Sequence, residues 1–180
     1  MSWHIKSSRA DSKGWVLRGC IGTFEPQELA QGLLRYTYVS ALNDHRFPPI
    51  SVKELPFLEC TVNFLTPFEL CRNLEDWEVG IHGIYVVIPR PGRSLSLSES
   101  DNMLKPDVRE AITATFLPDI ASAQGWSKAK TIENAVRKAG IRGTLTPAFY
   151  ASLRLYRYQG LKARATWDDY LAWKQGNKAH

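Results

Sequence analysis

Residues 15–24 have the sequence WVLRGCIGTF. The apolar residues at its start predict a strand over Trp15–Cys20, and a cysteine between two glycines, Gly19 and Gly22, is unusual at a strand end. Glycine has no Cβ, so each of these positions can adopt an uncommon backbone conformation or let another group approach the chain closely. The segment is therefore the first candidate for a functional site.

The regions around this segment have the patterns of short strands and helices. Trp3–Ser7 predicts a strand that forms a hairpin with Trp15–Cys20 through the polar linker Ser8–Gly14. Helical spacing of apolar residues predicts a helix that opens at Pro26 and ends at Asn43-Asp44. The N–H groups at the start of that helix carry a partial positive charge. Together with Arg18, they would favour a thiolate at Cys20 if the thiol points toward them.

Further elements follow toward the C-terminus. Alternation of apolar and polar residues predicts a half-buried strand at Leu58–Phe64, and the apolar run Ile84–Ile88 predicts a buried strand paired with Ile112–Phe116. Between these two strands, residues 90–109 are rich in Pro, Gly and Ser and predict an exposed insertion. The remaining predictions are a helix from Ala129 to Ala139 that Gly140 ends, a strand pair at Leu153–Tyr158 and Leu161–Thr166, and a short helix at Asp168–Lys174.

These elements define the fold class. Strands and helices do not alternate strictly, and many strands lie close enough in sequence to pair directly, which favours an α+β domain. A length of 180 residues fits one domain, and 44% hydrophobic residues supply a core. No apolar run approaches the roughly 18 residues that a membrane span needs, and no secretory signal opens the chain, so we expect an intracellular protein, cytoplasmic or nuclear, with no membrane contact.

Charge and cysteine content narrow the function classes. Residues 128–180 carry 11 Lys and Arg against 3 Asp and Glu, an asymmetry that can mark a nucleic-acid surface. Strand alternation and a helix end account for many of these charges, and no nucleic-acid-binding motif accompanies them, which argues against nucleic acid as a partner. Three dispersed cysteines without a Cys-x-x-Cys pair predict reduced thiols, and we expect no metal site and no cofactor.

Cys20 is a candidate nucleophile, and the alternative is a small, inert core residue. A nucleophile needs a base, and His82 is the best placed of the four histidines, with Glu78 or Asp76 to orient its ring. The alternative for His82 is a turn histidine hydrogen-bonded to the backbone. The candidate catalytic set is Cys20, His82 and Glu78.

A second interpretation is ligand binding. Arg18 and Arg46 would hold the carboxylate or phosphate of a small molecule or peptide while the backbone at Gly19 and Gly22 approaches it. Arg46 can equally form an ion pair with Asp44 that fixes the following turn, and both roles can hold at once. Because no protease, thioredoxin or metal framework surrounds the cysteine, a binding or interaction module is favoured over an enzyme.

The sequence resembles the AMME chromosomal region (AMMECR) domain family over nearly all of its length. Leu17–Phe24 matches the signature of that family residue for residue. The other matching segments, in order, are Ser40-Ala41-Leu42 with Asp44, Arg46–Pro49, Glu54–Pro56, Asp76–Gly80, His82–Ile84, Thr115–Pro118, and Trp126 with Arg137-Lys138.

The resemblance implies a compact two-lobed α+β domain, with an antiparallel β-sheet flanked by α-helices, whose biochemical activity is unsettled. It also implies partners: prokaryotic relatives occur beside or fused to Memo-type proteins, and with radical-SAM enzymes. That context suggests a conserved modification or redox process. Eukaryotic relatives largely stand alone, which suits a regulatory or adaptor protein.

Three departures from the family pattern matter. The helix that precedes the Trp3–Ser7 strand in relatives is absent here, so we expect exposed apolar side chains near that strand. The insertion at 90–109 is longer than the usual turn, and His45 replaces another small polar residue, so no shared role is assigned to it. The matching segments also predict that Cys20, Arg18, Arg46, Glu78 and His82 converge on one concave surface.

Overall fold

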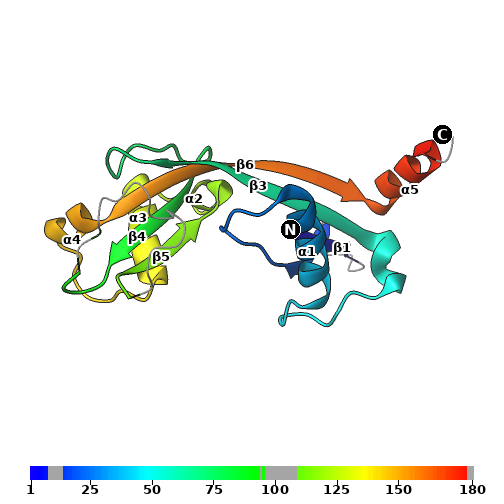
Figure 1. Cartoon of the computed structure of the whole chain (residues 1–180), viewed down its shortest axis with the longest axis horizontal. Coiled ribbons are helices and arrows are strands. Elements are labelled where there is room, and N and C mark those ends of the chain that lie inside the picture. Colours follow the sequence, from blue (N-terminus) through cyan, green and yellow to red (C-terminus); the bar gives the residue numbers. More distant parts are fainter. Residues whose placement is uncertain (8–13, 94, 96–108, 178–180) are drawn as a thin grey trace. The chain divides into compact units, whose positions relative to one another are not determined.

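A computed structural model describes residues 1–7, 14–93, 95 and 109–177. The chain divides into two compact units: Met1–Phe64 with Lys162–His180, and Leu65–Leu161. Two strands of 13 residues each, β3 (Leu58–Leu70) and β6 (Arg154–Thr166), run through both units (Figure 1). Strands and helices follow one another as the α+β class requires, and the strand pairings established in both units are antiparallel.

The first unit contains a sheet with the strand order β2-β1-β3. Its elements are β1 (Ser2–Lys6), β2 (Trp15–Cys20), α1 (Leu29–Leu42), the 3-10 helix η1 (Val52–Phe57), the first part of β3, the end of β6, and α5 (Trp167–Gly176). The predicted hairpin is confirmed, since β1 and β2 pair in antiparallel fashion, and α1 packs against both strands.

The hairpin is irregular inside the glycine-rich segment. Trp3 lies opposite Gly19 and His4 lies opposite Leu17, so Arg18 has no partner residue on β1. One extra residue on one strand is a β-bulge, which re-aims the side chain at that position. The bulge therefore directs Arg18 out of the ladder.

Helix α1 begins later than the apolar pattern predicts. Its first residue is Leu29, and the Glu28 carboxylate caps it by accepting the N–H groups of Ala30 (3.1 Å) and Gln31 (2.7 Å). A cap of this kind satisfies N–H groups that the first helical turn leaves free. The N–H groups of Ala30 and Gln31 at the helix start are thus occupied by the glutamate that precedes the helix.

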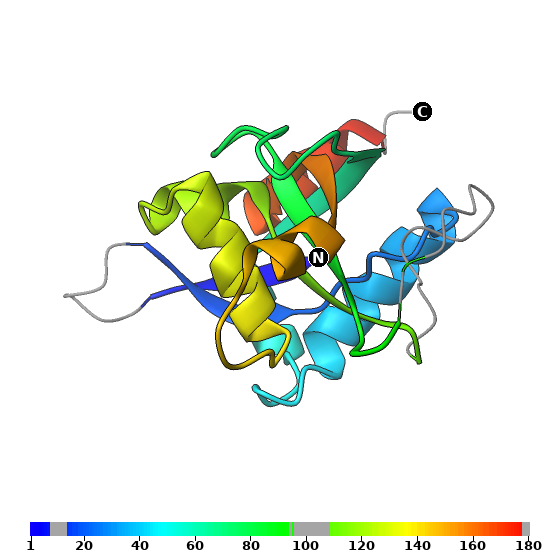
Figure 2. The ribbon, with the colours of Figure 1, turned by 90° about the vertical axis from the view of Figure 1, so that its left-hand side faces the viewer.

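The second unit carries the sheet order β3-β6-β4-β5. Its further elements are β4 (Gly83–Pro89), β5 (Ala111–Phe116), α2 (Pro118–Ala123), α3 (Lys128–Lys138, yellow in Figure 2) and α4 (Pro147–Ser152). The predicted pair of β4 with β5 is confirmed, with Ile84 opposite Phe116. Helix α3 also ends as predicted, because Gly140 has a φ of +89° and donates its N–H to Arg137 O.

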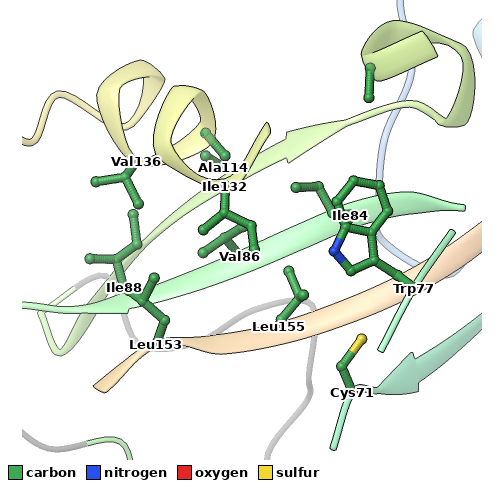
Figure 3. Packing of buried hydrophobic residues seen from close by; sticks show 12 residues of the cluster. Cys71, Trp77, Ile84, Val86, Ile88, Ala114, Ile132, Val136, Leu153 and Leu155 are labelled. Carbon is green, nitrogen blue, oxygen red and sulfur yellow. The ribbon is translucent and has the colours of Figure 1, made fainter. Parts of the chain in front are cut away.

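A hydrophobic core fills the second unit (Figure 3). Helices α2 and α3 contact β4, and α3 also contacts β5. Its buried residues are Cys71, Trp77, Ile84, Val86, Ile88, Ala114, Ala121, Ile132, Ala135, Val136, Leu153 and Leu155. The strand β4 is buried over six consecutive residues because neighbouring strands and helices cover it. This unit therefore has the arrangement that its continuous apolar run indicates.

The C-terminal strand pair predicted at Leu153–Tyr158 and Leu161–Thr166 is wrong. Both segments belong to the single strand β6, which continues through Gln159 and Gly160. The first half of β6 pairs with β4, where Tyr158 lies opposite Gly83, so the two halves do not pair with each other. Gly160 is a local turn signal, but the strand continues through it, and β6 lies between β3 and β4 in the sheet.

Other predictions can be compared directly. The helix at Asp168–Lys174 is confirmed within α5. The short helices α2 and α4 were missed, although each starts with a proline, a recognised signal at the first helical position. Of the insertion at 90–109, residues 94 and 96–108 lie outside the described residues, and 90–93 form an exposed turn.

Exposed apolar side chains were expected on or near the first strand. The strand itself is half-buried over Ser2–Ile5, and Trp3 Nε1 donates to Ser40 Oγ on α1 (3.1 Å). Exposed apolar side chains of the first unit include Leu34, Tyr38 and Leu42, which recur at helical spacing along α1.

Candidate functional site

Two side chains hold the backbone of Cys20. Asp44, just beyond α1, accepts the Cys20 N–H at Oδ2 (2.8 Å), and Arg46 Nη2 donates to the Cys20 carbonyl oxygen (2.9 Å). Met1 and Ile21 exchange both of their backbone hydrogen bonds, at 3.2 and 3.1 Å. In an antiparallel ladder the next residue then points its backbone groups away from the partner strand. Asp44 and Arg46 therefore provide hydrogen-bond partners for the Cys20 N–H and carbonyl groups at the edge of β2.

Asp44 and Arg46 also bind each other. The Asp44 side chain is only 5% exposed, and it accepts from Arg46 Nε (2.9 Å), Nη2 (2.7 Å) and the Arg46 backbone N–H (3.1 Å). The hydrogen bonds from the Arg46 side chain are the main reason that the pKa of Asp44 lies well below its ordinary value; burial opposes them and the Cys20 N–H assists. Asp44 raises the pKa of Arg46 in turn, and the Cys20 side chain adds a smaller contribution.

Three features of this region face solvent. The Cys20 thiol is free and exposed, and the Arg46 side chain is 57% exposed. The hydrogen bonds of the Arg46 guanidinium to Asp44 and to the Cys20 carbonyl oxygen use its Nε and Nη2 atoms. A Cβ built on Gly22 would meet nothing within 4 Å, and its φ is not positive. The fold therefore gives Gly22 no steric or conformational reason to be glycine.

Arg18 has a different environment from Arg46. Its guanidinium pairs with Glu54 through Nε–Oε1 (2.7 Å) and Nη2–Oε2 (3.3 Å), and it donates to the carbonyl oxygens of Pro48 (2.7 Å) and Pro49 (3.2 Å). The side chain is 13% exposed. The pKa of Glu54 is lowered, chiefly by Arg18 and then by the Ser51 N–H. Arg18 thus fastens the segment before β3 to β2 and has little donor capacity left for a ligand.

Gly19 is fixed by packing. A Cβ at this buried position would clash with the carbonyl oxygen of Ser40 on α1. The absence of a side chain lets β2 lie directly against the helix backbone. The two glycines of the segment therefore serve different purposes: Gly19 lets α1 approach, whereas Gly22 is open.

His82 and Glu78 lie in the turn before β4. The Glu78 N–H donates to His82 Nδ1 (3.0 Å), and the His82 N–H donates to Glu78 O (2.9 Å). A ring nitrogen that accepts carries no proton, so neutral His82 holds its proton on Nε2. The Glu78 carboxylate contacts Lys128 Nζ instead (3.3 Å). The backbone of Glu78, rather than its carboxylate, orients the imidazole, which is the turn-histidine arrangement.

The two candidate sets fall in different units. Cys20, Arg18, Gly19, Gly22, Asp44 and Arg46 belong to the first unit, and Glu78 and His82 belong to the second. Their convergence on one surface stays a prediction.

Sequence reasoning gave no role to Glu54, although the Ser51-x-x-Glu54 spacing is a capping-box signal. In the described ranges, no group of three His, Cys, Asp or Glu side chains has the arrangement of a metal site. None of the described helices is long and apolar enough to span a membrane.

These features define an α+β domain with a conspicuous glycine-flanked cysteine held by an Asp–Arg pair. Residues 2–163 match the model of the AMMECR1 family, and the chain belongs to that family. It is 38% identical over 162 residues to an uncharacterised protein of Arabidopsis thaliana, covering 90% of this chain and 69% of that one. An uncharacterised protein of Saccharomyces cerevisiae is 30% identical over 187 residues, covering 94% and 68%.

A solved structure supports the fold. The crystal structure of an uncharacterised protein from Pyrococcus horikoshii matches with a TM-score of 0.60 at 21% identity, covering 91% of this chain and 71% of that one. The family has no characterised function, so the activity of this chain has to be argued from its site.

Proposed function

We propose that this domain is a binding module whose site is the surface formed by Cys20, Gly22 and Arg46. Its ligand is an acidic group, a carboxylate or phosphate, on a small molecule or a protein partner. The observation that carries the proposal is the Arg46 guanidinium, which is 57% exposed and which Asp44 fixes in place beside Cys20 through Nε and Nη2.

The geometry suits an anion for two reasons. Asp44 is buried and Arg46 is exposed, so an anion arriving from solvent meets the cation first. The guanidinium is already oriented by its paired donors, so binding costs little side-chain entropy. Arg18 and Gly19, which were also predicted to bind ligand, support the site from behind by fixing β2 to its neighbours.

The test is an NMR titration of the whole chain with inorganic phosphate and, separately, with acetate. We expect chemical-shift changes at the Cys20 and Gly22 amides that disappear in Arg46→Gln and persist in Arg35→Gln, a matched change of an exposed arginine on α1. Gly22→Val, which has room in the fold, should block the approach without unfolding the chain. An absence of shifts in the native chain, or shifts indifferent to both site variants, would refute the proposal.

A cysteine-dependent enzyme is the second candidate, favoured by one contrast among the thiols. Cys20 is exposed, whereas burial raises the pKa of Cys71 to about 11. Thiol labelling against pH, with Cys20→Ser as control, separates the candidates. A binding module predicts that His82→Asn leaves the labelling profile of Cys20 unchanged, whereas a Cys20–His82 pair predicts a shifted profile. Mass spectrometry of the purified chain would show any adduct carried on Cys20.

The cellular role follows as part of the same proposal. A module that recognises an acidic group suits a regulatory or adaptor protein, and the family context extends this to partners of the Memo or radical-SAM type. The three free thiols suit a reducing compartment, so we propose a cytoplasmic or nuclear location. Affinity capture with the native chain and with Arg46→Gln as bait tests this role, since a partner of the proposed site should be lost only from the variant.

A further inference from the structure

The turn at Glu78–His82 closes on itself through reciprocal hydrogen bonds. The Glu78 carbonyl oxygen accepts the N–H groups of Ile81 (3.2 Å) and His82 (2.9 Å). In the other direction, the Glu78 N–H donates to His82 Nδ1 (3.0 Å). The hydrogen bond from the Glu78 N–H to His82 depends on the charge state of the ring, because Nδ1 can accept only while it is unprotonated.

The carboxylates near His82 are already paired with other cations, so they offer little stabilisation to a protonated ring. Those that act on the ring are Arg157 on β6, Glu69 on β3, and Asp76 and Glu78 in the connecting segment. Arg157 already holds both Glu69 (Nε–Oε2, 2.9 Å) and Asp76 (Nη1–Oδ1, 3.0 Å). Glu78 pairs with Lys128. An imidazolium would therefore compete with existing cations for every nearby carboxylate.

We propose that the Glu78–His82 turn is a pH-sensitive latch, closed by neutral His82 and released when Nδ1 takes up a proton. The residues of the turn belong to the second unit, and those of the surface proposed above for ligand binding belong to the first, so the latch does not rest on that proposal.

The direction of the pH dependence follows from the surroundings of the ring. Burial and then Arg157 lower the pKa of His82 below its ordinary 6.5. A depressed folded-state pKa means that the folded chain binds fewer protons, so the latch is fully closed above pH 6.5. It opens as the pH falls through the lowered pKa.

Release is confined to the turn because both of its ends are fixed. Trp77 is buried in the core on one side, with its Nε1 donating to Leu74 O (3.1 Å). On the other side, Gly83 packs so closely on Tyr158 that a Cβ there would lie 2.5 Å from the ring. Protonation should therefore loosen the Glu78 amide without unfolding the unit.

The experiment is hydrogen exchange of the Glu78 amide in the whole chain, expressed as protection relative to the unstructured rate and followed from pH ~7.5 downward beside the titration of the His82 ring. We expect protection to fall about two- to tenfold across the midpoint of the ring, the loss of one neutral hydrogen bond. In His82→Asn the amide oxygen can stand in for Nδ1 and does not titrate, so protection should show no such step. His45→Asn, the same change at an exposed histidine, should behave like the native chain.

Two results would overturn the latch: equal protection of the native chain on both sides of the midpoint of the ring, or the same acid loss in His82→Asn. If His82→Asn fails to fold, ring ¹⁵N shifts of the native chain decide the question. The latch requires an unprotonated Nδ1 at neutral pH and a shared midpoint for the ring and the Glu78 amide, and different midpoints would contradict it.

Discussion

The two units are stabilised by different kinds of contact. The second unit buries a continuous cluster of aliphatic and aromatic side chains around β4 (Figure 3). Among the described residues of the first unit, those classed as buried are Leu58, Gly19, Gly32, Ser40 and Asp44, of which only Leu58 is a large apolar residue. Here close backbone approach and directional polar bonds take the place of an aliphatic core.

This difference explains where the candidate site lies. Aliphatic packing tolerates many substitutions of similar volume, whereas hydrogen bonds and ion pairs fix a single geometry. In the first unit Arg18, Asp44 and Arg46 each bind backbone atoms as well as a charged partner. Such contacts hold the backbone of Cys20 in place while the residue stays exposed to solvent.

The largest effect is expected from breaking the core of the second unit. Trp77→Ala removes a side chain that is 2% exposed and leaves a cavity, which should cost about 3–5 kcal/mol of unfolding free energy. The control is Trp173→Ala on α5, where the side chain is 62% exposed and the change should stay within about 0.5 kcal/mol. Denaturant unfolding measures both, and similar losses for the two variants would contradict the comparison.

A glycine pair tests the first unit. Gly19→Ala forces a Cβ against Ser40 on α1, and we expect a loss of about 1–3 kcal/mol as the strand and helix separate. Gly22→Ala meets nothing within 4 Å, so its unfolding midpoint should match that of the native chain. Thermal unfolding of both variants provides the measurement. Equal destabilisation would mean that Gly22 also has a packing role.

The smallest effect concerns the charge on Asp44. Asp44→Asn keeps the shape but leaves Arg46 without its counter-ion, so the melting temperature at neutral pH should fall. Because the folded-state pKa of Asp44 is lowered, its contribution is present above about pH 4 and is lost as the pH falls through that lowered value. The difference in melting temperature between the variant and the native chain should therefore become smaller in acid. Asp168→Asn on exposed α5 serves as control, and a constant difference would argue against the pair.

Local patterns sufficed for much of the fold. The strands at Trp3, Trp15 and Ile84 and the helix ended by Gly140 follow from alternation, an apolar run and a terminal glycine. The joined strand β6 did not follow, because a Gln-Gly step indicates a turn, and the strands beside β6 in the sheet, β3 and β4, are distant from it in sequence. Pairing partners distant in sequence leave no local signal.

The candidate site shows the same division. The sequence by itself marked Cys20, Gly22 and Arg46, since a glycine-flanked cysteine and an arginine beside an aspartate are visible in the order of residues. Only the tertiary structure distinguished the exposed Arg46 from the largely buried Arg18, and the open position of Gly22 from the packed position of Gly19. Exposure and occupied hydrogen bonds depend on what the rest of the chain brings alongside: Glu54 and two proline carbonyls for Arg18, and the backbone of α1 for Gly19.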